Sequence, residues 1–268
     1  MHKYMKRTSL RFEKAIAALL LIGLIGVSCK KDDDGDNTPQ QTTENSANKQ
    51  PLGTSANELL SADEFTSLRV ELAYPDGFRP TQETIDLIDD FLEARLDKPD
   101  GITIVENRIE PTQTPPYTIN EIVAIEDENR TVFNNGDEIG VYIFFSDGNS
   151  SSNSGSSVVL GTAYRNTSMV IYEKTFMDLA DQSPTGINRT LIETSTLRHE
   201  FGHIFGLVNI GTPLTSDHED PDNNRHCVVE DCLMYFQTVT NIFNSSSLST
   251  IPDFDELCIA DLQANGGL

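Results

Sequence analysis

The sequence predicts an α/β fold in which helices pack on a mixed β-sheet. Segments with strand-like and helix-like patterns alternate along the chain from residue 67. An uninterrupted apolar run at 138–146 is typical of a central strand that is covered on both faces. Two further strand patterns, at 158–164 and 169–174, precede the clearest helix of the chain, at 187–206. This order of elements implies layers of sheet and helix.

Two strand–helix pairs precede the central strand. Residues 67–74 have β-branched and aromatic side chains over a strand-like length. The segment 81–98 carries apolar residues at helical spacing, with Thr81 as a candidate N-cap. A second strand is predicted at 101–109, and an amphipathic helix at 118–133. The chain therefore has enough elements for one substantial domain.

The N-terminal residues are predicted to lie outside that domain. A basic start and an apolar run at 15–27, too short to span a bilayer, predict a signal peptide over residues 1–28. The motif VSC, ending in Cys29 and followed by KKDDDGD, resembles a bacterial lipoprotein signal of the Bacteroidetes surface-export type. The resemblance implies a lipid anchor on Cys29 and a place in the outer membrane, facing the cell surface. The alternative is a buried Cys29 at the end of an ordinary cleaved signal.

The segment that follows Cys29 is polar, with almost no large apolar side chains. Such a segment cannot bury enough apolar surface to fold. Residues 29–57 are therefore predicted to form a disordered tether, and residues 58–268 the folded domain.

The charge of the chain restricts its partners. The formal net charge is −23, which argues against nucleic acid and against an anionic membrane surface as electrostatic partners. The same charge favours divalent cations wherever carboxylates gather. We expect a monomer.

The helix predicted at 187–206 carries the chemistry of the chain. Its sequence HEFGH places His199 and His203 four residues apart, on one helical face, with Glu200 next to them. Two neutral imidazoles in this arrangement are typical zinc ligands, and the glutamate is then positioned as general base. The alternative interpretation is a surface helix with two accidental histidines.

The residues after this helix resemble the metzincin metalloproteases. Gly206 completes the pattern HExxHxxG, and Met234 is a candidate for the methionine turn of that family. The resemblance implies a mixed twisted sheet with an antiparallel edge strand, for which residues 158–164 are the candidate. In that family the third metal ligand would fall at Asn209, and an amide is a poor zinc ligand.

A second resemblance suggests a different candidate for the third metal ligand. The segment RHCVVEDCLM, residues 225–234, is similar to the archaemetzincin branch, whose motif continues with His-Cys, four residues, Cys, one residue and Met. His226, Cys227, Cys232 and Met234 match it. Residues 208–225 are then an insertion, and His226 is the favoured third ligand. His218, Asp217 and Asn209 stay open as alternatives, because spacing alone does not discriminate among them.

The cysteines allow two interpretations. The archaemetzincin resemblance implies a second, structural zinc on Cys227, Cys232, Cys258 and one more cysteine, whose position here is taken by Asp255. An oxidising exterior instead favours a disulfide. We expect the disulfide, between Cys227 and Cys232, with Cys258 left over.

Together these observations predict a zinc-dependent peptidase that acts on peptides or proteins, with Glu200 as general base and zinc on His199, His203 and His226. The alternative function is a non-catalytic binding or structural lipoprotein that retains the metalloprotease fold.

Overall fold

The computed structural model describes residues 45–111, 115–155, 157–182, 188–237 and 250–268. Its centre is a five-stranded sheet with the strand order β2-β1-β3-β5-β4. The strands are β1 (Ser67–Tyr74), β2 (Ile102–Arg108), β3 (Glu138–Phe145), β4 (Gly161–Arg165) and β5 (Ser168–Ile171). The helices are α2 (Ala56–Leu60), α3 (Gln82–Glu93), α4 (Ile119–Asn129), α5 (Glu173–Gln182), α6 (Arg189–Ile204) and α8 (Glu256–Ala264).

The sheet is mixed, and the α/β prediction is confirmed. Strands β2, β1, β3 and β5 run parallel, whereas β4 pairs antiparallel with β5 at one edge. Helix α3 connects β1 to β2 and helix α4 connects β2 to β3, whereas strand β4 lies between the parallel neighbours β3 and β5 in sequence. Only the two residues Asn166 and Thr167 separate β4 from β5. A short connection of this kind reverses the chain, so β4 becomes the antiparallel edge.

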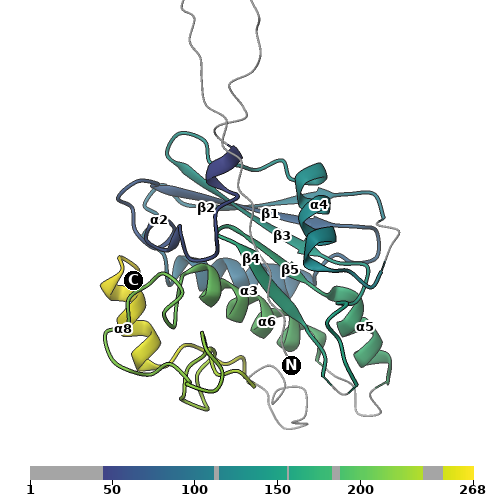
Figure 1. Ribbon diagram of the computed structural model, residues 1–268. Coiled ribbons are helices and arrows are strands. Elements are labelled where there is room, and N and C mark those ends of the chain that lie inside the picture. The colour runs from purple at the N-terminus through teal and green to yellow at the C-terminus, as the bar shows by residue number, and fades with distance from the viewer. Residues whose placement is uncertain (1–44, 112–114, 156, 183–187, 238–249) are drawn as a thin grey trace, which may run out of the picture. The chain divides into compact units, whose positions relative to one another are not determined.

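Both faces of the sheet are covered, with α4 on one side and α3, α5 and α6 on the other (Figure 1). The alternation along β3 shows the consequence. Ile139, Val141 and Ile143 belong to a core shared with α3 and α6. Tyr142 and Phe144 belong to a second core shared with α4. The prediction of a doubly covered central strand is therefore confirmed.

Two predicted helices end earlier than expected. The N-cap Thr81 accepts a hydrogen bond from the N–H of Thr84, as predicted, but α3 ends at Glu93. Helix α4 ends at Asn129 because Arg130 turns extended. There the buried Arg130 guanidinium pairs with Glu126 and donates to the Gly140 carbonyl.

The strand prediction at 169–174 is wrong at its C-terminal end. Strand β5 stops at Ile171, and Glu173 begins helix α5. The helix that follows was not predicted, although its apolar residues recur at helical spacing and Phe176 joins the main core.

The folded domain begins earlier than residue 58, so the prediction of a tether over 29–57 is wrong for residues 45–57. Asn48 is fully buried, and its Nδ2 donates to the Asn134 side chain and to the Gly140 carbonyl at 2.6 and 3.0 Å. The side chain of Asn166 in turn donates to the Ala47 carbonyl at 2.7 Å. Polar contacts thus hold a segment whose one large apolar side chain is Leu52. Residues 1–44, including Cys29, lie outside the described residues.

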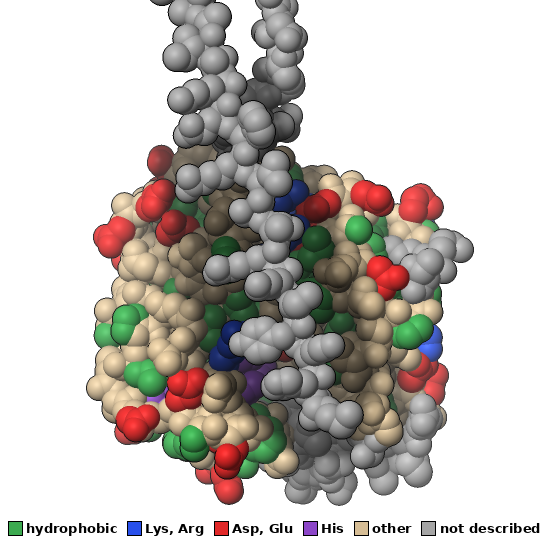
Figure 2. Space-filling model, viewed as in Figure 1, with side chains coloured by type: hydrophobic (Ala, Val, Ile, Leu, Met, Phe, Trp, Pro, Cys, Tyr) green, Lys and Arg blue, Asp and Glu red, His purple; other side chains and the backbone are tan. Residues whose placement is uncertain are grey.

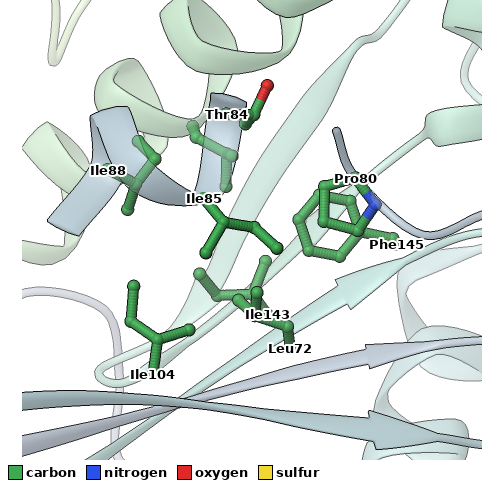
Figure 3. A pocket seen from close by; sticks show the side chains of 9 residues that line it. Leu72, Pro80, Thr84, Ile85, Ile88, Ile104, Ile143 and Phe145 are labelled. Atoms are coloured by element: carbon green, nitrogen blue, oxygen red, sulfur yellow. The ribbon is translucent and has the colours of Figure 1, made fainter. Parts of the chain in front are cut away.

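No helix of the described residues is able to span a membrane, because none combines the length and the hydrophobicity that crossing a bilayer requires. A cavity of about 10 Å³ lies between α3 and the sheet, lined by apolar side chains such as Leu72, Ile85 and Ile143 (Figure 3). This volume is at the lower limit for a single water molecule.

Candidate metal centre

Helix α6 presents two histidines from one of its faces. It runs from Arg189 to Ile204, and the side chain of its N-cap Asn188 accepts a hydrogen bond from Leu191 N–H. The helix packs against α3, β4 and β5, so it is buried around most of its circumference. The His199 and His203 rings lie 4.8 Å apart, centroid to centroid.

The structure brings His226 to these two rings. Its ring centroid lies 5.4 Å from that of His199 and 5.2 Å from that of His203. One candidate ligand atom from each of the three histidines lies within 4.8 Å of the others. Three rings at nearly equal separations form a triangle about a common centre, which is the arrangement that a single ion needs.

Hydrogen bonds fix the orientation of two of these rings. The Leu233 carbonyl lies 2.7 Å from His199 Nδ1, and the Asn224 carbonyl lies 3.1 Å from His226 Nδ1. A carbonyl only accepts, so each Nδ1 carries the proton and each Nε2 of the neutral ring keeps its lone pair. His203 Nδ1 is buried without a hydrogen-bond partner in the described residues. The donor set therefore fits a divalent metal ion.

The electrostatics keep the rings neutral. Burial lowers the pKa of His199 to about 4. Burial also lowers the pKa of His203 well below its usual range, and the neighbouring His199 and His226 add to that shift. The pKa of His226 is lowered as well, again mainly by burial. Neutral imidazole is the form that binds metals.

Glu200 is held between the histidine-bearing face of α6 and the edge strand β4. Its Oε2 accepts a hydrogen bond of 2.7 Å from Ala163 N–H in β4. Burial raises the pKa of this carboxyl to about 7, against the lowering effect of that hydrogen bond. A carboxyl that titrates near neutrality is suited to accept and return a proton.

The close approach of β4 to α6 requires a glycine. A Cβ on Gly161 would lie 2.8 Å from both Glu200 Cγ and Thr196 Cγ2. We expect Gly161→Ala to displace the Glu200 side chain or the strand, and to lower the free energy of unfolding by about 1–3 kcal/mol through overpacking. Chemical denaturation checks this, with Val158→Ala, at an exposed position before β4, as the control. Equal stability of the two variants would contradict the assigned contact.

Hydrogen bonds join the two ends of the segment 208–225, which the resemblance interprets as an insertion. Glu219 and Cys227 form an antiparallel bridge, and Asp220 N–H donates to the His226 carbonyl at 2.8 Å. Glu219 also accepts from the Arg225 N–H and from the Asn209 side chain, at 2.9 and 3.0 Å. The two ends of the loop are thereby joined beside α6.

The rival third ligands lie elsewhere. Asp217 is exposed, and Asn209 is engaged with Glu219. His218 is buried, with its Nε2 2.7 Å from Asp261 Oδ2 and its Nδ1 3.3 Å from Cys227 Sγ. It thus belongs with the cysteines rather than with the other histidines. Burial lowers the pKa of His218, but hydrogen bonds with Cys227 and Asp261 more than offset this, so its pKa is raised.

The cysteines form a second cluster, which we call the thiol group: Cys227, Cys232, Asp255 and Cys258. One ligand atom from each lies within 4.8 Å of the others, and the three cysteines are fully buried. The expectation of a disulfide is not met, since no disulfide links any two of these three described cysteines. Sequence proximity suggested the Cys227–Cys232 pair, whereas helix α8 brings Cys258 to 3.6 Å from Cys232. Three sulfurs and a carboxylate in this geometry suit a zinc ion.

Helix α8 supplies half of the thiol group. Asp255 is its N-cap and accepts a hydrogen bond of 2.9 Å from the Cys258 backbone N–H, which orients the Asp255 carboxylate. Hydrogen bonds with Cys232 and Cys258 lower the pKa of Cys227, so its thiolate is favoured.

Met234 packs against helix α6 at Gly202. It is fully buried, and its sulfur would be only 2.3 Å from a Cβ on Gly202, which stands between Glu200 and His203 in sequence. The helix therefore rests on the methionine at a position where only glycine fits.

Sequence reasoning missed three parts of this region: the Leu233 carbonyl, the buried His218–Asp261 pair and the contact at Gly161. A backbone carbonyl leaves no sequence signal. The gathering of four histidines between 199 and 226 was a signal for His218, but it pointed to metal binding in general.

No protein-family model and no curated protein matches this sequence. Among solved structures, the chain is similar to archaemetzincin from Methanopyrus kandleri, with a TM-score of 0.46 and 19% sequence identity, over 75% of this chain and 96% of that chain. A similarity of this strength does not assign the chain to that family.

Proposed function

We propose that this protein is a zinc-dependent peptidase whose metal is held by His199, His203 and His226. The observation that carries the proposal is the convergence of these three imidazoles, from two distant segments, beside the buried carboxyl of Glu200. Their neutral state and the fixed tautomers of His199 and His226 support a metal rather than a core role.

The chemistry divides between the ion and the carboxyl. A zinc ion at this site supplies Lewis acidity, which acidifies a water molecule and polarises a peptide carbonyl. Glu200 takes the proton from the attacking water and delivers it to the leaving amine. Its hydrogen bond from Ala163 keeps the carboxyl in place for both transfers.

Strand β4 is the proposed platform for the substrate. It is the outermost strand on its side of the sheet, and it lies against Glu200 through Gly161 and Ala163. An extended peptide adds to such an edge through main-chain hydrogen bonds. This places the scissile bond of a bound peptide close to the carboxyl that handles the proton, as the metzincin resemblance implies.

The proposal includes a second, structural zinc on the thiol group. Removal of metal tests both sites together. We expect the purified full-length chain to carry zinc, to lose peptidase activity when a chelator removes it, and to recover activity when zinc is returned. Elemental analysis and cleavage of a mixed peptide library measure this. Bound zinc without cleavage of any peptide would favour the non-catalytic alternative, and the absence of bound metal would refute the peptidase proposal.

We further propose that the protein is exported and lipid-anchored through Cys29, which rests on the sequence alone. Labelled palmitate supplied to expressing bacteria should enter the wild-type chain and not Cys29→Ser. The label should remain in Cys258→Ser, which removes another cysteine. Equal labelling of wild type and Cys29→Ser would contradict the anchor.

A further inference from the structure

One short segment serves both clusters. We call His199, His203 and His226 the histidine group. Residues 226–234, called here the shared segment, begin with His226 of that group and continue directly with Cys227 of the thiol group. Cys232 follows near its other end. The two candidate metal sites are thus connected by a single peptide bond.

The shared segment also orients a second histidine. The Leu233 carbonyl that accepts from His199 Nδ1–H belongs to the residue after Cys232. Leu233 is itself held by a hydrogen bond of 2.9 Å from its N–H to the Asp253 carbonyl, two residues before Asp255. Cys227 therefore directly follows His226, and Cys232 directly precedes Leu233, whose carbonyl orients His199.

Regular secondary structure does not hold this segment. It contains no helix or strand, and it follows the insertion at 208–225, which likewise has neither. A hydrogen bond of 2.8 Å from Cys227 N–H to the Met234 carbonyl closes it into a loop. The thiol group connects that loop to helix α8, through Asp255 and Cys258. The position of the loop beside α6 therefore depends on contacts made by Cys227 and Cys232.

From these contacts we propose that metal bound by the thiol group sets the geometry of the histidine group, so that the two sites bind metal with positive cooperativity. Asp255 and Cys258 are then positioning residues for a site that they do not touch. The inference rests on the proposed function only in taking the histidine group as a metal site. It adds an energetic coupling between the two candidate metal sites.

The expected loss of zinc affinity at the histidine group follows from the contacts that position its imidazoles. Removing an outer partner of a metal ligand reduces metal affinity by about 10–100-fold. Here the placement of His226 and the hydrogen bond to His199 are both affected, so we expect a loss of at least about 10-fold at the histidine group. Coupling between binding sites is reciprocal, so filling the histidine group must tighten the thiol group by the same factor.

The test is zinc affinity, measured on the full-length chain by competition with chelators of graded strength. Asp255→Asn is the main variant, because asparagine still caps helix α8 but is a poor zinc ligand. Cys258→Ser is the second variant. Gln263→Ala, exposed on the same helix, is the matched control and should leave both affinities unchanged. Circular dichroism confirms that each variant is folded.

Weaker zinc binding at the histidine group in both variants, together with weaker binding at the thiol group in His203→Ala by a similar factor, supports the proposal. If folded Asp255→Asn or Cys258→Ser binds zinc at the histidine group as tightly as wild type, the coupling is refuted while the peptidase proposal stands. A wild-type chain with no zinc at the histidine group refutes both the coupling and the peptidase proposal.

Discussion

Replacing Glu200 by glutamine is expected to reduce peptide cleavage by about 10²–10⁴-fold, the usual contribution of a general base. Glutamine has the same shape, and its amide oxygen still accepts the hydrogen bond from Ala163 N–H. It has no carboxylate to take up a proton. The three histidines are unchanged, so zinc content should equal that of wild type.

The measurement pairs a cleavage rate with elemental analysis of the same sample. Glu193→Gln does not serve as a control, because the Glu193 carboxylate is buried and accepts a hydrogen bond from the Thr84 hydroxyl. Glu256→Gln is suitable, since Glu256 lies in the first turn of α8 and belongs to neither cluster. Full activity in Glu200→Gln would remove Glu200 from the mechanism.

The second large effect is expected at His226. Replacing it by alanine leaves two imidazoles from one helix and no third nitrogen among the residues gathered at that site. Loss of an outer partner already costs up to about 100-fold in metal affinity, and loss of a ligand should cost more. We therefore expect His226→Ala to lose both zinc from this site and peptide cleavage.

Asp217→Ala is the matched control, because Asp217 belongs to the same insertion region and was a rival ligand, yet it is exposed and lies outside the histidine group. It should retain zinc and activity. If Asp217→Ala loses the metal while His226→Ala keeps it, the insertion adopts a different path when the metal is bound.

The sheet was predictable because its signals are local. The first strand was predicted at 67–74 and is observed at Ser67–Tyr74. The start of the domain was not predictable in this way. Asn48 is held by Asn134, Gly140 and Thr167, which are 86, 92 and 119 residues away in the chain. The composition of this segment shows that large apolar side chains are few, but it gives no information about hydrogen-bond partners that are distant in sequence.

The histidine site was partly predictable for the same reason. His199 and His203 share one helical turn, so their spacing alone brings them together. His226 was reached only through a motif resemblance, since the closure of the insertion depends on the Glu219–Cys227 bridge. The state of the cysteines was mispredicted because helix α8, which carries Cys258, returns from far along the sequence.

Because the folded domain starts early, the linker between the proposed lipid anchor and the domain is short. If lipid on Cys29 marks the membrane, only residues 30–44 separate it from the anchored Asn48 region, and a fully extended chain of that length spans at most about 50 Å. Such a peptidase would meet proteins embedded in, or resting on, its own membrane far more often than proteins diffusing past the cell.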